Sequence, residues 1–180
     1  MASLSPVTRH FILHWGEMGT RWGVNRTVAQ IHALLFLAAE PMSAEEIVDT
    51  LHVARSNVST SLRELQSWGL VKEVHILGDR RAHFESLKDV WQMYRLILEE
   101  RKRREIDPTL AMLRESVAAL EKPASGDEYV RERVSETLEF FETVTVAYDE
   151  TRRLPVQMLK RFGKMRGKVR KLLSIRSAGD

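Results

Sequence analysis

The sequence predicts a mainly α-helical protein with one small β-hairpin. Apolar residues recur at three- and four-residue steps along most of the chain, which is the period of an amphipathic helix. Between residues 70 and 87 the pattern changes to alternation on either side of LGDRR, which is typical of two strands joined by a turn. A chain of 180 residues can bury one sizeable core and carry an additional helical region.

Two helices are expected in the first 40 residues. Ser5 and Pro6 form a helix start signal, and one apolar stripe follows before Gly19 and Gly23. The stripe comprises Val7, Phe11, Trp15 and Met18. Asn25 is the expected N-cap of the second helix, which a proline stops. Its apolar face comprises Val28, Ile31, Leu35 and Ala38.

A short helix and a longer helix are expected next. Ser43 and Glu46 stand three residues apart, so they can form a reciprocal capping box for a helix that runs through Leu51. The longer helix covers residues 55–67, and Gly69 supplies the left-handed residue that ends it.

The two faces of the longer helix differ in an unusual way. Its apolar face comprises Val58, Leu62 and Leu65. The opposite face comprises Ser56, Thr60, Arg63 and Ser67, with Asn57 and Ser59 on the flanks. A helix that merely faces water usually carries Glu and Lys there, because Ser and Asn lower helix stability. Small hydroxyl and amide groups suit a close approach to the major groove of DNA. The alternative is a loosely optimised surface helix.

The hairpin completes a recognisable unit. Residues 70–76 and 82–87 are expected as strands with Phe84 facing inward, and the turn between them carries Arg80 and Arg81. Helix, short helix, polar-faced helix and basic-tipped hairpin make a winged helix-turn-helix domain, which we place at residues 25–88.

Three segments resemble a known family: ARSNVSTSLRELQSWGLV, GDRRAHFES and WQMYRLILEERKRREIDPTLAMLRE. They resemble MarR-like winged-helix regulators, in the branch typified by the glycine-betaine synthesis repressor, over about residues 5–120. The resemblance implies a homodimeric transcriptional regulator, which we expect to be a repressor of a pseudo-palindromic operator. It also implies a recognition helix at 55–67 and a wing at 77–83. Ala54 replaces the Ser or Thr cap common in such helices, which leaves capping to Ser56 or to no side chain.

The residues expected to contact double-stranded DNA lie on these elements. They are Ser43, Arg55, Ser56, Asn57, Ser59, Thr60, Arg63, Arg80 and Arg81. Asn57 and Arg63 can pair with base edges, whereas the two wing arginines are better placed for phosphates or the minor groove. Asp79 is expected to orient one of those arginines, because it would repel phosphate.

Apolar stripes outside this domain predict dimerisation through residues 1–24 and 89–151. The stripes comprise Leu87, Val90, Tyr94, Ile97, Leu98, Leu110, Leu113, Val117, Leu120, Val130, Val134, Leu138, Phe141, Val144 and Tyr148. Asp107 and Pro108 mark a break or restart within them, and residues 121–128 are expected as a loop. The pattern does not decide whether the last two helices pair within one chain or across two.

Charge and composition set the expected compartment. The chain has no cysteine, no signal peptide and no apolar run long enough for a membrane span, so we expect a soluble cytoplasmic protein. Residues 152–180 form a basic tail with ten Lys or Arg and one acid, whereas the other residues hold 18 bases and 24 acids. Such a tail suits an anionic partner or serves solubility.

No enzyme, cofactor or metal site is expected. The glycines of GEMGTRWG have the wrong spacing for a nucleotide loop, and no G-x-S-x-G motif occurs. His10 and His14 with Glu17 offer metal ligands, but we interpret them as a surface or interface pair. The different-class alternative to a DNA-binding regulator is a helical protein-interaction adaptor that uses a winged fold.

A cluster of aromatic residues is the candidate ligand pocket. It comprises Phe11, Trp15, Trp22, Trp91 and Tyr94. Such rings can enclose a small organic cation such as choline, which would act as an effector. The alternative, which we favour, is that they fill the core or the dimer interface.

Overall fold

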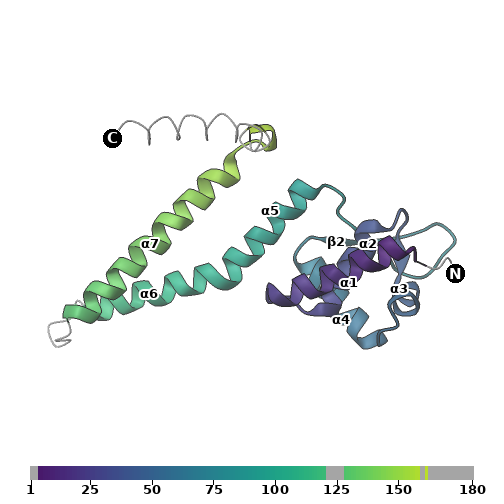
Figure 1. Cartoon of the computed structure of the whole chain (residues 1–180), viewed down its shortest axis with the longest axis horizontal. Coiled ribbons are helices and arrows are strands. Elements are labelled where there is room, and N and C mark those ends of the chain that lie inside the picture. The colour runs from purple at the N-terminus through teal and green to yellow at the C-terminus, as the bar shows by residue number, and fades with distance from the viewer. Residues whose placement is uncertain (1–3, 121–127, 159–160, 162–180) are drawn as a thin grey trace. The chain divides into compact units, whose positions relative to one another are not determined.

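The computed structural model describes residues 4–120, 128–158 and 161, which belong to two units. The first unit is residues 1–100 and the second is residues 101–180. Figure 1 gives the order of the elements from α1 to α7. The chain is mainly helical with a small three-stranded antiparallel sheet, so the predicted fold class is confirmed.

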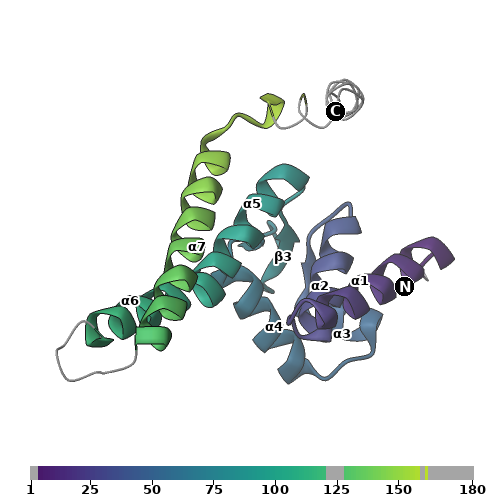
Figure 2. The same cartoon turned by 60° about the vertical axis from the view of Figure 1, so that its left-hand side comes forward.

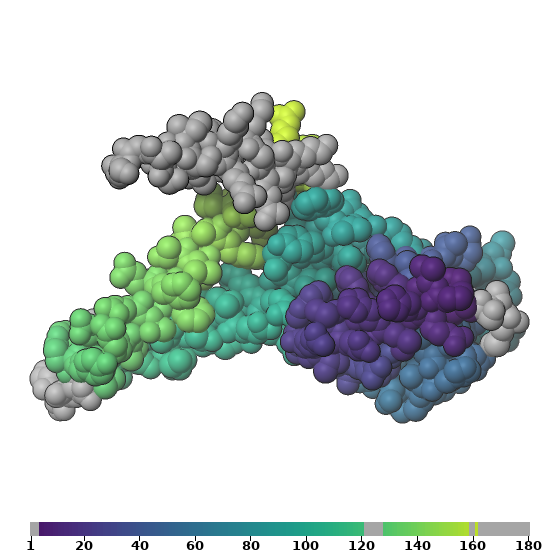
Figure 3. Space-filling model, viewed as in Figure 1, coloured from purple at the N-terminus to yellow at the C-terminus, as the bar shows by residue number. Residues whose placement is uncertain are grey.

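Helix α1 (Pro6–Arg21) and helix α2 (Arg26–Leu37) begin at the predicted caps. The Ser5 side chain accepts a hydrogen bond from the backbone N–H of Thr8, and the Asn25 side chain accepts one from Thr27. The apolar face of α2 is buried as expected, and Ala38 is its C-cap. Helix α1 lies on the surface of this unit (Figure 3).

The buried face of α1 differs from the predicted stripe. Val7 is 79% exposed, whereas the buried residues of α1 are Ile12, Gly16 and Gly19. A Cβ atom added at Gly19 would stand 2.5 Å from the Cβ of Ala29, which is too close for any side chain. The glycines therefore let α1 approach α2 closely, a packing role that an apolar pattern does not reveal.

The sheet has the order β1-β3-β2 and consists of β1 (Met42–Ser43), β2 (Val71–Val74) and β3 (His83–Ser86). The predicted hairpin is confirmed as the antiparallel pair β2 and β3, with Phe84 buried. Strand β1 was not predicted from the sequence. It pairs Ser43 with His83 and so joins the hairpin to the helices.

Helix α3 (Ala44–Leu51) begins directly after β1, and helix α4 (Arg55–Ser67) follows. The predicted capping box is present at the start of α3. Gly69, with φ of +71°, follows the end of α4 in the left-handed conformation, as expected. The core lies between these helices, α2 and the sheet, and its largest fully buried apolar side chains are Ile31, Leu35, Ile47, Val58, Leu65 and Leu70.

Two consecutive residues attach helix α5 (Val90–Arg101) to this core. The Lys88 ammonium donates to the carbonyl oxygens of Leu35, Phe36 and Ala38 at 2.8, 2.9 and 2.6 Å, and these carbonyls end α2. The Asp89 carboxylate accepts from the first backbone N–H groups of α5. Burial lowers the pKa of Lys88. The wing is therefore followed at once by a fixed junction between α2 and α5.

Helix α5 turns its Met93 side toward the core of the first unit. Val90 and Tyr94, two residues of the stripe predicted for dimerisation, are 54% and 50% exposed. They are therefore accessible to a second copy.

The second unit is built from two packed helices, α6 (Asp107–Leu120) and α7 (Glu128–Arg153), which lie side by side in Figure 2. A π-helical turn at Lys102–Ile106 precedes α6, which begins at Asp107 as predicted. Leu110 and Leu113 are buried, and an ion pair of 2.8 Å joins Arg114 to Glu142 across the two helices.

Helices α6 and α7 contact each other within one chain. Of the expected loop at residues 121–128, residues 121–127 lie outside the described residues, and Glu128 belongs to α7. Helix α7 has no fully buried residue, and several large apolar side chains on it stay exposed, namely Tyr129, Val130, Phe140, Val144 and Val146. No helix among the described residues is long and apolar enough to cross a membrane.

Candidate nucleic-acid interface

Helix α4 separates a buried face from a polar face. Val58, Leu62 and Leu65 are each at most 2% exposed and hold the helix against the core. The opposite side is exposed at every position named as a DNA contact: Arg55, Ser56, Asn57, Ser59, Thr60 and Arg63. The structure thus brings these six residues together on one accessible surface, which we call the α4 polar face.

The side chains of the α4 polar face are held only lightly. Arg63 lies along its own helix, with Nε 3.4 Å from the carbonyl oxygen of Ser59 and Nη2 3.4 Å from Oγ1 of Thr60. These distances are long for hydrogen bonds to a guanidinium, so Arg63 can exchange them for a better acceptor. Ala54 is the N-cap of α4 and no side chain caps it, which is one of the two outcomes expected from the sequence.

Ser43 was expected to contact DNA, and the structure shows that this is wrong. Its side chain is fully buried at 0% exposure. The hydroxyl donates to the Glu46 carboxylate at 2.8 Å and accepts from the Glu46 backbone N–H at 3.3 Å. Hydrogen bonds from the backbone and side chain of Ser43 lower the pKa of Glu46. Ser43 therefore fixes the start of α3 and the edge of the sheet.

The wing carries two arginines in different states. Arg81 donates to Asp79 through a bidentate ion pair, in which Nη2 lies 2.6 Å from Oδ2 and Nε lies 3.1 Å from Oδ1. These hydrogen bonds hold the pKa of Asp79 well below its usual range and raise the pKa of Arg81. Arg80 is exposed and has no polar partner among the described residues. Asp79 thus orients Arg81 and leaves Arg80 free to reach a ligand.

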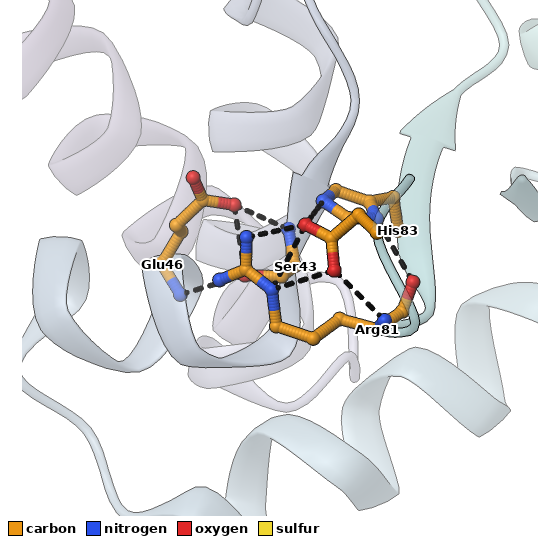
Figure 4. Close-up of polar contacts among 5 residues, drawn as sticks. Ser43, Glu46, Arg81 and His83 are labelled. Atoms are coloured by element: carbon orange, nitrogen blue, oxygen red, sulfur yellow. Dashed lines mark hydrogen bonds and ion pairs between the residues drawn. The ribbon is translucent and has the colours of Figure 1, made fainter. Parts of the chain in front are cut away.

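The same network reaches the base of the hairpin. His83 is 4% exposed, and its Nδ1 lies 3.0 Å from the carbonyl oxygen of Arg81. Its Nε2 lies 3.5 Å from Asp79, so the wing tip is tied to the strand that pairs with Ser43 (Figure 4). These contacts therefore connect the wing tip to the base of the hairpin.

Two features of this surface were missed from the sequence. Leu77, beside Gly78 at the wing tip, is fully exposed, and an apolar residue next to a turn glycine was the available signal. Glu45 on α3 forms an ion pair of 2.8 Å with Arg55 on α4. No local spacing rule links residues ten positions apart on two helices, so this pair had no sequence signal.

Of the five aromatic residues expected to form a pocket, Phe11 and Trp15 line the same cavity in the first unit. They stack at 5.4 Å, and the cavity of about 20 Å³ has room for about one water molecule. The rest of its lining is His32, Ala33, Phe36 and Met93. Trp22 contacts Trp15 edge-on, but it is 50% exposed, as is Tyr94, and neither of them nor Trp91 lines the cavity.

The candidate metal ligands do not form a site either. His10 and His14 stack with their ring centroids 6.4 Å apart. No group of three potential ligands suited to a metal ion occurs among the described residues. Within that part of the chain, the surface that gathers most of the predicted site residues is the α4 polar face together with the wing.

Comparison with known proteins agrees with this architecture. The model of the MarR family matches residues 22–82. The HTH-type transcriptional repressor GbsR of Bacillus subtilis (strain 168) is 23% identical over 136 residues, which cover 74% of this chain and 75% of that repressor.

Solved structures extend the comparison to the fold. A crystal structure of a transcriptional regulator matches with a TM-score of 0.64 at 19% sequence identity, over 82% of this chain and 96% of the other. A transcriptional regulator from Thermotoga maritima covers 82% of this chain and 92% of its own at 15% identity, but its TM-score of 0.38 is too low to bear on the fold. The segment from α2 to the wing is thus similar to the MarR family, the chain as a whole is similar to a transcriptional repressor, and its fold is shared with a solved structure.

Proposed function

We propose that this protein is a homodimeric repressor that binds a specific DNA sequence through the α4 polar face and the wing. The single observation that carries the proposal is the fully exposed row of small polar side chains on α4, opposite a fully buried apolar face. Such a row fits the donor and acceptor pattern of a major groove, and the wing adds a free guanidinium for the backbone. The name of the similar repressor supports the direction of regulation.

The test is a selection of duplexes from fragmented genomic DNA in the presence of excess competitor. A regulator retains one short duplex, here called the operator, whereas an adaptor protein retains none. Salt titrations of variants on the operator and on a scrambled duplex then assign the roles. Asn57→Ala and Arg63→Ala should each reduce the difference in binding free energy between the operator and the scrambled duplex by about 1–3 kcal/mol. Arg80→Ala should weaken binding to both duplexes. It should also reduce the slope of the logarithm of affinity against the logarithm of salt concentration by about one unit.

We propose that a second copy covers exposed apolar side chains of residues 1–24 and 89–151. Phe140, at 62% exposure, and Val146, at 63%, lie on α7 among these uncovered groups. Two copies related by twofold symmetry would present their α4 helices to half-sites about 34 Å apart. Light scattering at micromolar concentration should give the mass of a dimer, and a monomer would contradict this part of the proposal.

We infer that a response to a small organic ligand would require the cavity beside Trp15 to open, because its present volume has room for about one water molecule. The cavity is lined by His32, whose buried Nε2 has no hydrogen-bond partner in the described part of the chain. Burial lowers the pKa of His32 to about 4, so the ring is neutral at physiological pH. Calorimetry with choline should therefore show no binding, and measurable heat would restore the cation hypothesis.

A further inference from the structure

The ion pair between Glu45 and Arg55 is hard to explain by stability. It joins the first turns of α3 and α4 at 2.8 Å, and its side chains are 75% exposed for Arg55 and 41% for Glu45. Ion pairs this exposed add little to the free energy of unfolding, because water and salt screen them. The pair is therefore better explained by a role at the surface of α3 and α4 than by stability.

Arg55 occupies a position that is unfavourable for a cation. It is the first residue of α4, where the helix dipole favours negative charge, and no side chain caps this end of the helix. Arg55 nevertheless stands at the exposed N-terminal end of the α4 polar face, which is the part of a recognition helix that meets base edges. Contact with DNA explains why an arginine occupies position 55. The role of the neighbouring Glu45 carboxylate remains to be explained.

We propose that Glu45 determines specificity by holding Arg55, an inference that rests on the proposed function. The carboxylate fixes the direction of the guanidinium, which favours one operator contact. It also cancels the charge of Arg55 at distances beyond the screening length of about 8 Å, so the arginine adds little to sequence-independent attraction. Glu45 is a positioning residue, because its contact with Arg55, rather than a contact of its own with DNA, carries the effect.

The wing shows the same combination of arginine and acid. Asp79 binds Arg81, and Glu45 and Glu46 lie near enough to raise the pKa of Arg81 further. Two of the four arginines predicted to contact DNA are therefore paired with acids, whereas Arg63 rests on its own helix and Arg80 is free in the described part of the chain. The charge available for phosphate attraction is concentrated on these last two residues.

The test is Glu45→Gln, measured by salt titration on the selected operator duplex and on a scrambled duplex of the same composition. Freeing one arginine should steepen the salt slope on the scrambled duplex by about one unit, which corresponds to about eightfold tighter binding at 0.1 M salt. Operator binding should gain less, because the direction of Arg55 is lost. The ratio of operator to scrambled affinity should therefore fall.

Two variants serve as controls. Asp49→Asn removes the same charge from an exposed position on the same helix and should leave the ratio unchanged. Arg55→Gln should weaken operator binding but change the slope on the scrambled duplex by much less than one unit, unlike Arg80→Ala. In the Arg55→Gln background, Glu45→Gln should change the slope by much less than one unit, because only its weaker interaction with Arg81 remains. Thermal melts of each variant check that the domain is folded.

The outcomes separate this inference from the proposed function. If the wild-type protein shows no operator preference, the proposed function fails. If the wild-type protein prefers the operator, two results for Glu45→Gln would show that Glu45 does not determine specificity. One is an unchanged salt slope on the scrambled duplex, and the other is an equal gain in affinity for both duplexes. An equal effect of Asp49→Asn overturns the inference as well, because removal of any nearby negative charge would then suffice.

Discussion

Acidification should destabilise the protein through His32, a residue on α2 with no role in the proposed DNA contacts. Its side chain is 4% exposed, its Nε2 lacks a hydrogen-bond partner in the described part of the chain, and burial lowers its pKa from 6.5 to about 4. The folded protein therefore keeps the ring neutral between these two values, whereas the unfolded chain takes up a proton below pH 6.5. The free energy of unfolding must fall as the pH falls through this window.

The size of the effect follows from the two pKa values. The gap between 6.5 and about 4 corresponds to a loss of about 3 kcal/mol once the pH is below both. About 2 kcal/mol of this loss falls between pH 7 and pH 5. Asp79 and Glu46 have lowered pKa values, so their contributions are lost only at more acidic pH. The window between pH 7 and pH 5 therefore isolates the histidine.

The assay is urea unfolding at pH 7, 6 and 5 and at fixed protein concentration, with His32→Leu as the matched variant. The wild-type free energy should fall across the series, and that of His32→Leu should stay flat or nearly so. The leucine also removes an unsatisfied buried nitrogen, so the variant should be at least as stable as the wild type at pH 5. Parallel pH profiles for the two proteins would refute the reasoning.

Four further changes test the fold and the tail. Lys88→Met should lower the unfolding free energy by about 1–2 kcal/mol in urea, since the three carbonyls at the end of α2 lose their charged donor; an unchanged midpoint would argue against this. Gly19→Val should cost about 1–3 kcal/mol by the same assay, because its Cβ would overlap Ala29. Ser43→Ala should cost about 1 kcal/mol through the lost capping box, and no loss would contradict its structural role. Removal of residues 154–180 should weaken binding to all DNA alike and keep operator preference; loss of preference alone would make the tail a reader of sequence.

Local signals made most of the fold predictable. Three helix starts were predicted from the capping residues Ser5, Asn25 and Ser43, and the structure confirms each one. Each side chain bonds a backbone N–H only two or three residues later. The polar face of α4 was visible because its small side chains contradict the usual composition of a solvated helix. Signals of this kind depend on the neighbouring sequence alone.

Contacts between distant segments were not predictable in the same way. Strand β1 has only two residues, and its partner β3 lies forty positions later in the chain. Ser43 was misassigned as a DNA contact because its burial depends on that pairing. Which side of α5 turns inward, Met93 or Tyr94, is decided by the surface of the domain it meets, and the periodic pattern alone does not identify it.

Ser43 is both a residue of strand β1 and the N-cap of α3, so it couples the wing to the helices. Its partner His83 lies in strand β3, which continues from the wing tip. Lifting the hairpin at that point would expose a hydroxyl that is now fully buried and would break the cap of α3. A rotation of the β2–β3 hairpin relative to α3 is therefore coupled to the hydrogen bonds that begin α3. Adjustment to the groove width of a given sequence is left to the loop at residues 75–82 and to the bending of the duplex itself.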